Sequence, residues 1–202
     1  MPRIFLISDN HFSDYDDLKD VIHVFQRKNP DTNEKYPNLS AMNADMIKRW
    51  NRTVQPEDQV FSIGDFAWTR EEFQKYINQL NGKKHFIMGN HDLEGDLKKI
   101  KDADYFDAFF PIMAFFSYKK RDFLFVHDPK DVPKWWNGWV IHGHHHWMPE
   151  YPFIDGKKKN INVACERVNY TPVDLDWIIN LNIDTIEWMD TTDSKTITRF
   201  HH

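Results

Sequence analysis

RIFLISDNH occupies residues 3–11 of this chain and places a run of apolar residues directly before Asp9 and His11. A continuous apolar run of this length is typical of a β-strand that is covered on both faces. Polar residues at the end of such a strand lie where α/β proteins carry their chemistry. The stretch therefore predicts a first strand over residues 3–8, with Asp9 and His11 in the loop that follows it.

The same arrangement, an apolar run followed by polar residues, occurs four more times along the chain. The runs and the motifs that follow them are residues 59–63 before Gly64-Asp65, 85–88 before Gly89-Asn90-His91-Asp92, 122–126 before His127, and 139–141 before Gly143-His144-His145-His146. Another strand-like run covers residues 161–164. Together the motifs supply the nitrogen and oxygen ligands that two neighbouring divalent metals need.

Helical patterns separate the first strands. Apolar residues recur at helical spacing within residues 18–25, 39–50 and 73–80. Residues 29–38 contain two prolines and several turn formers, which predicts a loop. Strands dominate the second half as far as a short helical segment at 175–179, and residues 183–189 with 195–200 suggest a terminal hairpin. This order predicts one α/β domain over residues 1–202, with two stacked mixed sheets and helices outside them.

The composition narrows the class of protein. A chain of 202 residues with 41% hydrophobic content can bury one substantial core, and its apolar runs are too short to span a membrane. The formal net charge of −5 argues against an extended nucleic-acid surface. The negative net charge does not exclude nucleotide substrates, because bound metals add local positive charge. The lone Cys165 cannot form an intramolecular disulfide and fits a reducing compartment, so we expect a cytoplasmic protein with no membrane partner.

Three further features of the sequence each have two interpretations. The basic runs Lys157-Lys158-Lys159 and Lys119-Lys120-Arg121 fit solvated turns better than phosphate contacts. The pair Trp135-Trp136 could stack on a base or pack locally. The final His201-His202 could be native or the remainder of a purification tag.

The motif residues divide naturally between two metal ions. Asp65 is the natural bridge, because a carboxylate has two oxygens and a negative charge that offsets the repulsion between cations. Asp9 and His11 are two residues apart and can hold one ion together. The other expected ligands are Asn90, His127, His144 and His146, with His145 facing away. Imidazole and carboxylate ligands without thiolate point to Mn²⁺, Fe or Zn²⁺ rather than Ca²⁺.

Each motif alone also has an ordinary structural explanation. Asp-x-His can be a turn or a helix cap, Gly-His-x-His a solvated turn, and His127 a hydrogen-bonded core histidine. Their joint occurrence in this order, each at a predicted strand end, favours the metal site.

These residues resemble the calcineurin-like metallophosphoesterase superfamily, whose pattern runs D-x-H, G-D, G-N-H-E/D, H, G-H-x-H. The match covers residues 4–146 and fills every position. The resemblance implies a four-layer α-β-β-α sandwich and a division of ligands between two metals. One metal would be held by Asp9, His11, Asp65 and His146, and the other by Asp65, Asn90, His127 and His144. His91 would be a catalytic histidine that binds no metal, and Asp92 would orient its imidazole and raise its basicity.

Finer similarities and departures narrow the group. Trp50-Asn51 with Gly64-Asp65-Phe66 resembles the small bacterial and phage metallophosphoesterases. The Gly-Asp-x-x-Asp-Arg-Gly extension of Ser/Thr protein phosphatases is missing, since Ala67-Trp68-Thr69-Arg70 stands in its place. The resemblance therefore disfavours a protein phosphatase.

The complete ligand set predicts metal-dependent hydrolysis of a phosphate ester by a hydroxide held between two divalent metals. Mn²⁺ is favoured, with Fe, Zn²⁺, Ni²⁺ and Mg²⁺ as alternatives. A phosphodiesterase acting on a nucleotide or a small diester is favoured, because no arginine cluster is evident to neutralise a dianionic monoester. The alternatives are a phosphomonoesterase, a nuclease, and a metal-binding scaffold without catalysis.

Overall fold

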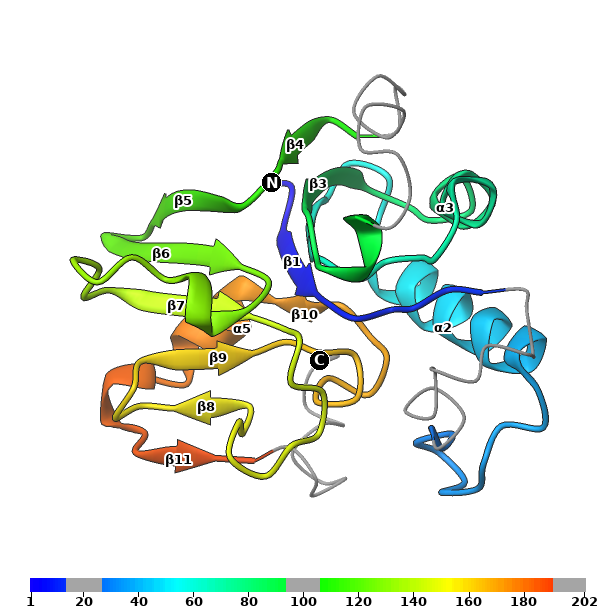
Figure 1. Ribbon diagram of the computed structural model, residues 1–202. Helices are drawn as coiled ribbons and strands as arrows, with labels where there is room; N and C mark the ends of the chain where they lie inside the picture. The colour runs from blue at the N-terminus through cyan, green and yellow to red at the C-terminus, as the bar shows by residue number, and fades with distance from the viewer. Residues whose placement is uncertain (14–26, 94–105, 191–202) are drawn as a thin grey trace.

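The computed structural model describes residues 1–13, 27–93 and 106–190, which form two β-sheets (Figure 1). The first sheet has the strand order β10-β1-β2-β3-β4. Its strands are β1 Ile4–Ile7, β2 Gln59–Ile63, β3 Lys83–Ile87, β4 Ala108–Phe110 and β10 Val173–Asp174. β1 to β4 run parallel, and β10 pairs antiparallel with β1. All four residues of β1 are buried, as its continuous apolar run predicted.

The second sheet has the order β11-β8-β9-β7-β6-β5 and is also mixed. Its strands are β5 Met113–Tyr118, β6 Arg121–Val126, β7 Trp139–His142, β8 Ile154–Asp155, β9 Asn160–Asn162 and β11 Trp188–Met189. β6, β7 and β9 are parallel neighbours, whereas β5, β8 and β11 each pair antiparallel. The carboxyl ends of β6 and β7 therefore meet at one edge of this sheet, as those of β1, β2 and β3 do in the first.

The helices begin at well-formed caps. The side chain of Asn38 accepts a hydrogen bond from the N–H of Ala41 at the start of α2, Leu39–Thr53. Thr69 and Glu72 form a reciprocal capping box at the start of α3, Arg70–Ile77. Both helices lie on the side of the first sheet that faces away from the second (Figure 1). The other α-helix of the described residues, α5, is short and covers Leu175–Asn180.

Aromatic side chains join the layers. Phe61 on β2 contacts Phe116 on β5 and Phe125 on β6, with ring centroids 5.2 and 4.9 Å apart, so it bridges the two sheets. Phe73 on α3 contacts Phe86 on β3 at 5.2 Å and attaches the helix to the first sheet. Edge-to-face pairs such as these add stability beyond their buried area.

The prediction of an α/β fold with two mixed sheets and flanking helices is confirmed. The six predicted apolar runs coincide with strands β1, β2, β3, β6, β7 and β9. The predicted helix at 18–25 and the hairpin arm at 195–200 lie outside the described residues. The other arm was wrong, because Ile183–Thr185 is a 3-10 turn and β11 pairs with β8. Among the described residues, none of the helices is long and apolar enough for a membrane span.

Candidate dinuclear metal centre

Two groups of ligating side chains lie at neighbouring strand ends. Asp9, His11 and His146 form the first group, and Asp65, His127 and His144 form the second. Within each group the ligating atoms all lie within 4.8 Å of one another. These six residues follow β1, β2, β6 and β7, so the parallel arrangement of strands in each sheet brings the motifs together. The two groups fit a dinuclear metal centre.

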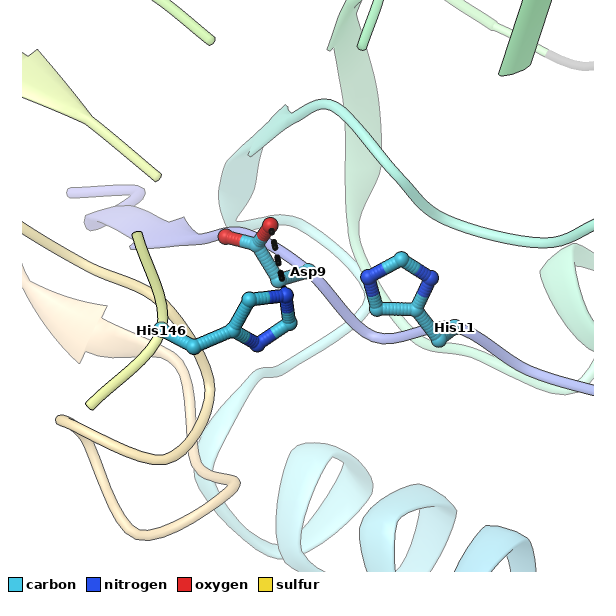
Figure 2. Close-up of side chains that lie close together, drawn as sticks. All are labelled: Asp9, His11 and His146. Carbon is cyan, nitrogen blue, oxygen red and sulfur yellow. Dashed lines mark ion pairs between the residues drawn. The ribbon is translucent and has the colours of Figure 1, made fainter. Parts of the chain in front are cut away.

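In the first group, Asp9 and His11 lie after β1, and His146 reaches them from the loop after β7 (Figure 2). His146 Nε2 is 3.7 Å from Asp9 Oδ1. His11 Nε2 is buried and has no hydrogen-bond partner. Burial lowers the pKa of His11 well below its ordinary value, which leaves a neutral imidazole with a free lone pair. An unpartnered buried nitrogen of this kind fits a metal ligand, because a metal would satisfy it.

Asp65 lies between the two groups. Its Oδ2 is 3.2 Å from His127 Nε2 in its own group and 3.7 Å from His11 Nε2 in the other. Asn90 adds an amide oxygen that is 3.0 Å from His127 Nε2. The expected bridging position of Asp65 and the proximity of Asn90 therefore agree with the geometry, and their roles as ligands remain proposals.

The ring nitrogens that point away from the centre have partners of their own. His127 Nδ1 is 2.9 Å from the carbonyl oxygen of Ile63, and His146 Nδ1 is 2.9 Å from Glu166 Oε1. An N–H that donates to an oxygen acceptor fixes the tautomer and leaves Nε2 available as a ligand. Both imidazoles are thus oriented for metal binding before any metal arrives.

In the second group, His127 and Asp65 shift each other's pKa. Burial would lower the pKa of His127, but its hydrogen bond to Asp65 and the charge of that carboxylate raise it to about 10. Burial would raise the pKa of Asp65, but His127 holds it below its ordinary value. In the metal-free protein His127 and Asp65 therefore stabilise each other's charged forms.

Metal binding is expected to release about one proton from His127 at pH 8, because a ligating imidazole must be neutral. The pKa of about 10 puts this group almost fully in its protonated form at that pH. Apparent metal affinity should consequently rise with pH up to about that value. Titration calorimetry in two buffers of different ionisation enthalpy measures the released protons. Heats that do not depend on the buffer would contradict the expectation, and His127→Gln should reduce the dependence.

Five of the proposed ligands sit in the left-handed region of backbone space. Their φ angles are 59° at Asp9, 50° at His11, 53° at Asp65, 68° at His144 and 42° at His146. Each such residue other than glycine costs about 1–2 kcal/mol relative to ordinary backbone. Strain of this kind persists only where the surroundings enforce it, and it concentrates at functional sites.

Arg27 and Glu166 help to hold the strained loops in place, and the sequence did not predict this role for them. The buried guanidinium of Arg27 donates to the carbonyl oxygens of Asp9 and Asn10 at 2.6 and 2.7 Å. It also pairs with Glu166 at 2.7 Å, and Glu166 accepts from His146. Burial opposes ionisation of Glu166, but Arg27 and His146 hold its pKa below the ordinary value. This network ties the loop after β1 to the loop after β7.

Glu166→Gln is expected to weaken metal binding at the first group by about 10–100-fold, because the imidazole of His146 loses its charged partner. The loss should appear as a lower affinity for one of two ions in titration calorimetry of the metal-free protein. Glu187→Gln is the matched control, since the Glu187 side chain is 80% exposed and pairs only at the surface. Equal affinities in both variants would show that Glu166 does not support the site.

Two motif glycines are required by close approach. A Cβ on Gly89 would overlap Oδ1 and the backbone nitrogen of Asp65, and one on Gly143 would overlap Oδ2 of Asp9. In each case the glycine of one motif makes room for the carboxylate of another. This explains physically why glycine precedes both Asn90 and His144.

His91 lies beside the centre, and the described hydrogen bonds of Asp92 go to backbone N–H groups rather than to the His91 imidazole. The His91 ring contacts the rings of Trp68 and His11, with centroids 4.5 and 5.5 Å apart. The backbone N–H of His91 donates to Asp65 Oδ1. The buried Asp92 carboxylate instead accepts the backbone N–H groups of Asp65, Phe66 and Gly89 at 2.7, 3.0 and 2.8 Å. Asp92 therefore holds two motif loops together, and Trp68 takes the place beside His91.

The remaining residues that the sequence singled out make local contacts. The His145 ring stacks on Tyr151, with centroids 3.5 Å apart, and belongs to neither group. Trp135 stacks on Phe115, which is the local packing that the sequence left open. Lys157 and Lys158 pair with Glu187 and Asp155, as residues of a solvated turn do.

Comparisons with known proteins agree with this geometry. A sequence model described as calcineurin-like phosphoesterase matches residues 2–180. The chain is 35% identical over 187 residues to the uncharacterized protein MJ1445 of Methanocaldococcus jannaschii, covering 90% of this chain and 92% of that protein. Its fold resembles the crystal structure of AQ665, a protein of unknown function from Aquifex aeolicus, with a TM-score of 0.64 and 22% identity over 90% of this chain and all of that one. By the family match over most of its length, the chain belongs to the calcineurin-like phosphoesterase family.

Proposed function

We propose that this protein is a dinuclear metal-dependent phosphodiesterase that acts on a nucleotide or another small diester. The observation that carries the proposal is the pair of ligand groups with Asp65 between them and His91 beside them. Family membership implies a phosphate-ester substrate, and the choice of a diester is ours.

Seven side chains would hold the two ions, namely Asp9, His11, Asp65, Asn90, His127, His144 and His146. Bound divalent metals supply an activated water nucleophile and positive charge for the phosphoryl oxygens. The chain itself fixes the geometry, since Asp65, Phe66 and Gly89 are held by Asp92 and the loop after β1 by Arg27. In this proposal His91 would donate a proton to the departing alkoxide. The nitrogen and oxygen ligands suit Mn²⁺, with Fe, Zn²⁺, Ni²⁺ or Mg²⁺ as alternatives.

The charges near the centre support a diester over a monoester. Arg27 is buried and donates to Glu166 and two backbone carbonyls, so it is not available to a substrate. No arginine lines the cavity beside Asn90 and His127 in the described part of the chain. A dianionic monoester is usually bound by arginine side chains that donate two parallel hydrogen bonds, whereas a monoanionic diester needs fewer such donors.

Paired chromogenic substrates test the function. Metal-stripped protein reloaded with Mn²⁺, Mg²⁺, Zn²⁺ or Ni²⁺ is expected to hydrolyse bis(4-nitrophenyl) phosphate faster than 4-nitrophenyl phosphate, with Asp65→Ala as the blank. A faster monoester reaction would replace the diesterase with a phosphatase. Two bound ions without turnover of either compound would favour a metal-binding scaffold.

A further inference from the structure

A cavity of about 300 Å³ opens beside the second ligand group. It lies between the end of β3, the turn from β4 to β5, and the short 3-10 helix η2 at Pro129–Asp131. Its lining consists of Met88, Gly89, Asn90, Pro111, Ile112, His127, Asp128, Lys130 and Asp131. The volume is at the lower end of the range for small-molecule sites, about 300–1,000 Å³, so it suits one small ring system rather than a large ligand.

The lining does not suit a second anionic group. Among the described residues, Lys130 supplies the only ammonium of the lining, and Lys130 Nζ already lies 2.6 Å from Asp128 Oδ2. Asp131 adds a further negative charge, so the described lining carries two carboxylates against one ammonium. Met88, Pro111 and Ile112 supply an apolar wall, and Ile112 is 60% exposed although it is a large apolar residue. This combination favours an uncharged, largely apolar group.

The cavity and His91 border different parts of the centre. Asn90 and His127 border the cavity, but no residue of the first ligand group lines it. The His91 ring instead contacts His11 of that first group and the ring of Trp68. A phosphate centred near Asp65 could therefore direct one substituent toward His91 and the other into the cavity. A monoester has only one substituent and would leave one of these places empty.

We propose, on the basis of the proposed function, that the cavity binds the retained substituent of a phosphodiester and that this substituent is an uncharged flat ring about the size of a phenyl group or a nucleobase. In the reaction, the oxygen of water forms a bond to phosphorus and the bond to the substituent nearest His91 breaks. The proton from His91 goes to the departing oxygen, and a proton from the attacking water restores His91. The ester bond to the substituent in the cavity stays intact, so the products are one alcohol and one monoester.

Two diesters with the same leaving group test the proposal. Bis(4-nitrophenyl) phosphate and methyl 4-nitrophenyl phosphate both release 4-nitrophenol, but their retained groups are an aryl ring and a methyl group. We expect a KM for the aryl diester about tenfold lower than for the methyl diester, from partial burial of one ring. Ile112→Asp should remove this difference between the two KM values, because it places a carboxylate in the apolar wall of the cavity. Trp188→Asp is the control, because Trp188 is 54% exposed on β11 at the opposite edge of the second sheet from β5.

A binding measurement separates failure of the cavity from failure of the function. In metal-loaded His91→Ala protein, addition of bis(4-nitrophenyl) phosphate should shift the NMR signal of the Ile112 δ1 methyl group, whereas dimethyl phosphate should not. Turnover with the same KM ratio in wild-type and Ile112→Asp protein would overturn the cavity proposal and leave the phosphodiesterase standing. Saturable binding at Ile112 without any turnover would keep the cavity and overturn the function. An unshifted Ile112 signal at saturating ligand would overturn the cavity by itself.

Discussion

Asp65→Ala is expected to lower kcat/KM for the diester by about three orders of magnitude or more and to reduce the number of bound metal ions. Asp65 is the carboxylate whose Oδ2 faces a histidine of each ligand group, and its Oδ1 also accepts the N–H of His91. Its removal thus disturbs both groups and the backbone of the proposed acid together. Metal catalysis contributes several kcal/mol to such reactions, and each 1.4 kcal/mol is about tenfold in rate. Kinetics and elemental analysis of the same preparation measure both effects.

The control for this variant is Asp31→Ala. Asp31 is 74% exposed and pairs with Arg49 at the surface, so its loss should change neither metal content nor rate. If the Asp65→Ala protein kept two ions per chain and its full activity, the assignment of Asp65 as the bridge would be wrong. Loss of activity with two tightly bound ions would instead mean that Asp65 acts mainly on His91.

His91→Ala is expected to lower kcat by about 10²–10⁴-fold, the range for loss of a general acid, without loss of metal. The His91 side chain contacts the rings of Trp68 and His11 but belongs to neither ligand group. The loss should be larger for a diester with an alkyl leaving group than for one that releases 4-nitrophenol, because a good leaving group needs little protonation. Comparison of the two leaving groups in wild-type and variant protein measures this difference.

Two outcomes would argue against this role of His91. An equal loss for both leaving groups would indicate that His91 stabilises the phosphate rather than protonating the alkoxide. A loss of metal that parallels the loss of rate would make His91 a ligand or a support for one. Asn51→Ala, at the partly exposed end of α2, is the control and should change neither quantity.

The candidate metal ligands could be predicted because each signal is local. An apolar run predicts a strand, and the residues directly after β1, β2, β3, β6 and β7 then fall at strand ends whatever the rest of the chain does. Strands such as β8, β10 and β11 contain only two residues each, and tertiary pairing rather than sequence pattern defines them. Strand β5 was not predicted from the sequence, because it lies at the edge of the sheet and Phe115 on it remains 57% exposed.

The residues that support the ligands could not be predicted in the same way. Arg27 and Glu166 are 139 positions apart, and only the folded chain brings them together under Asp9 and His146. The backbone partners of Asp92 could not be predicted either, because adjacency to His91 in sequence says little about the direction of a side chain in a 3-10 turn. Its carboxylate satisfies three buried N–H groups, which would otherwise lack partners.

The left-handed backbone conformation of five candidate ligands implies a conflict between stability and activity. Glycine adopts positive φ without the steric cost that Asp9, Asp65 and the three histidines incur. A glycine at any of these positions would relieve backbone strain and at the same time delete a ligand. Selection for thermal stability alone would therefore erase the centre one residue at a time, so an engineer who seeks a more heat-resistant variant should leave these five positions fixed and look for gains elsewhere.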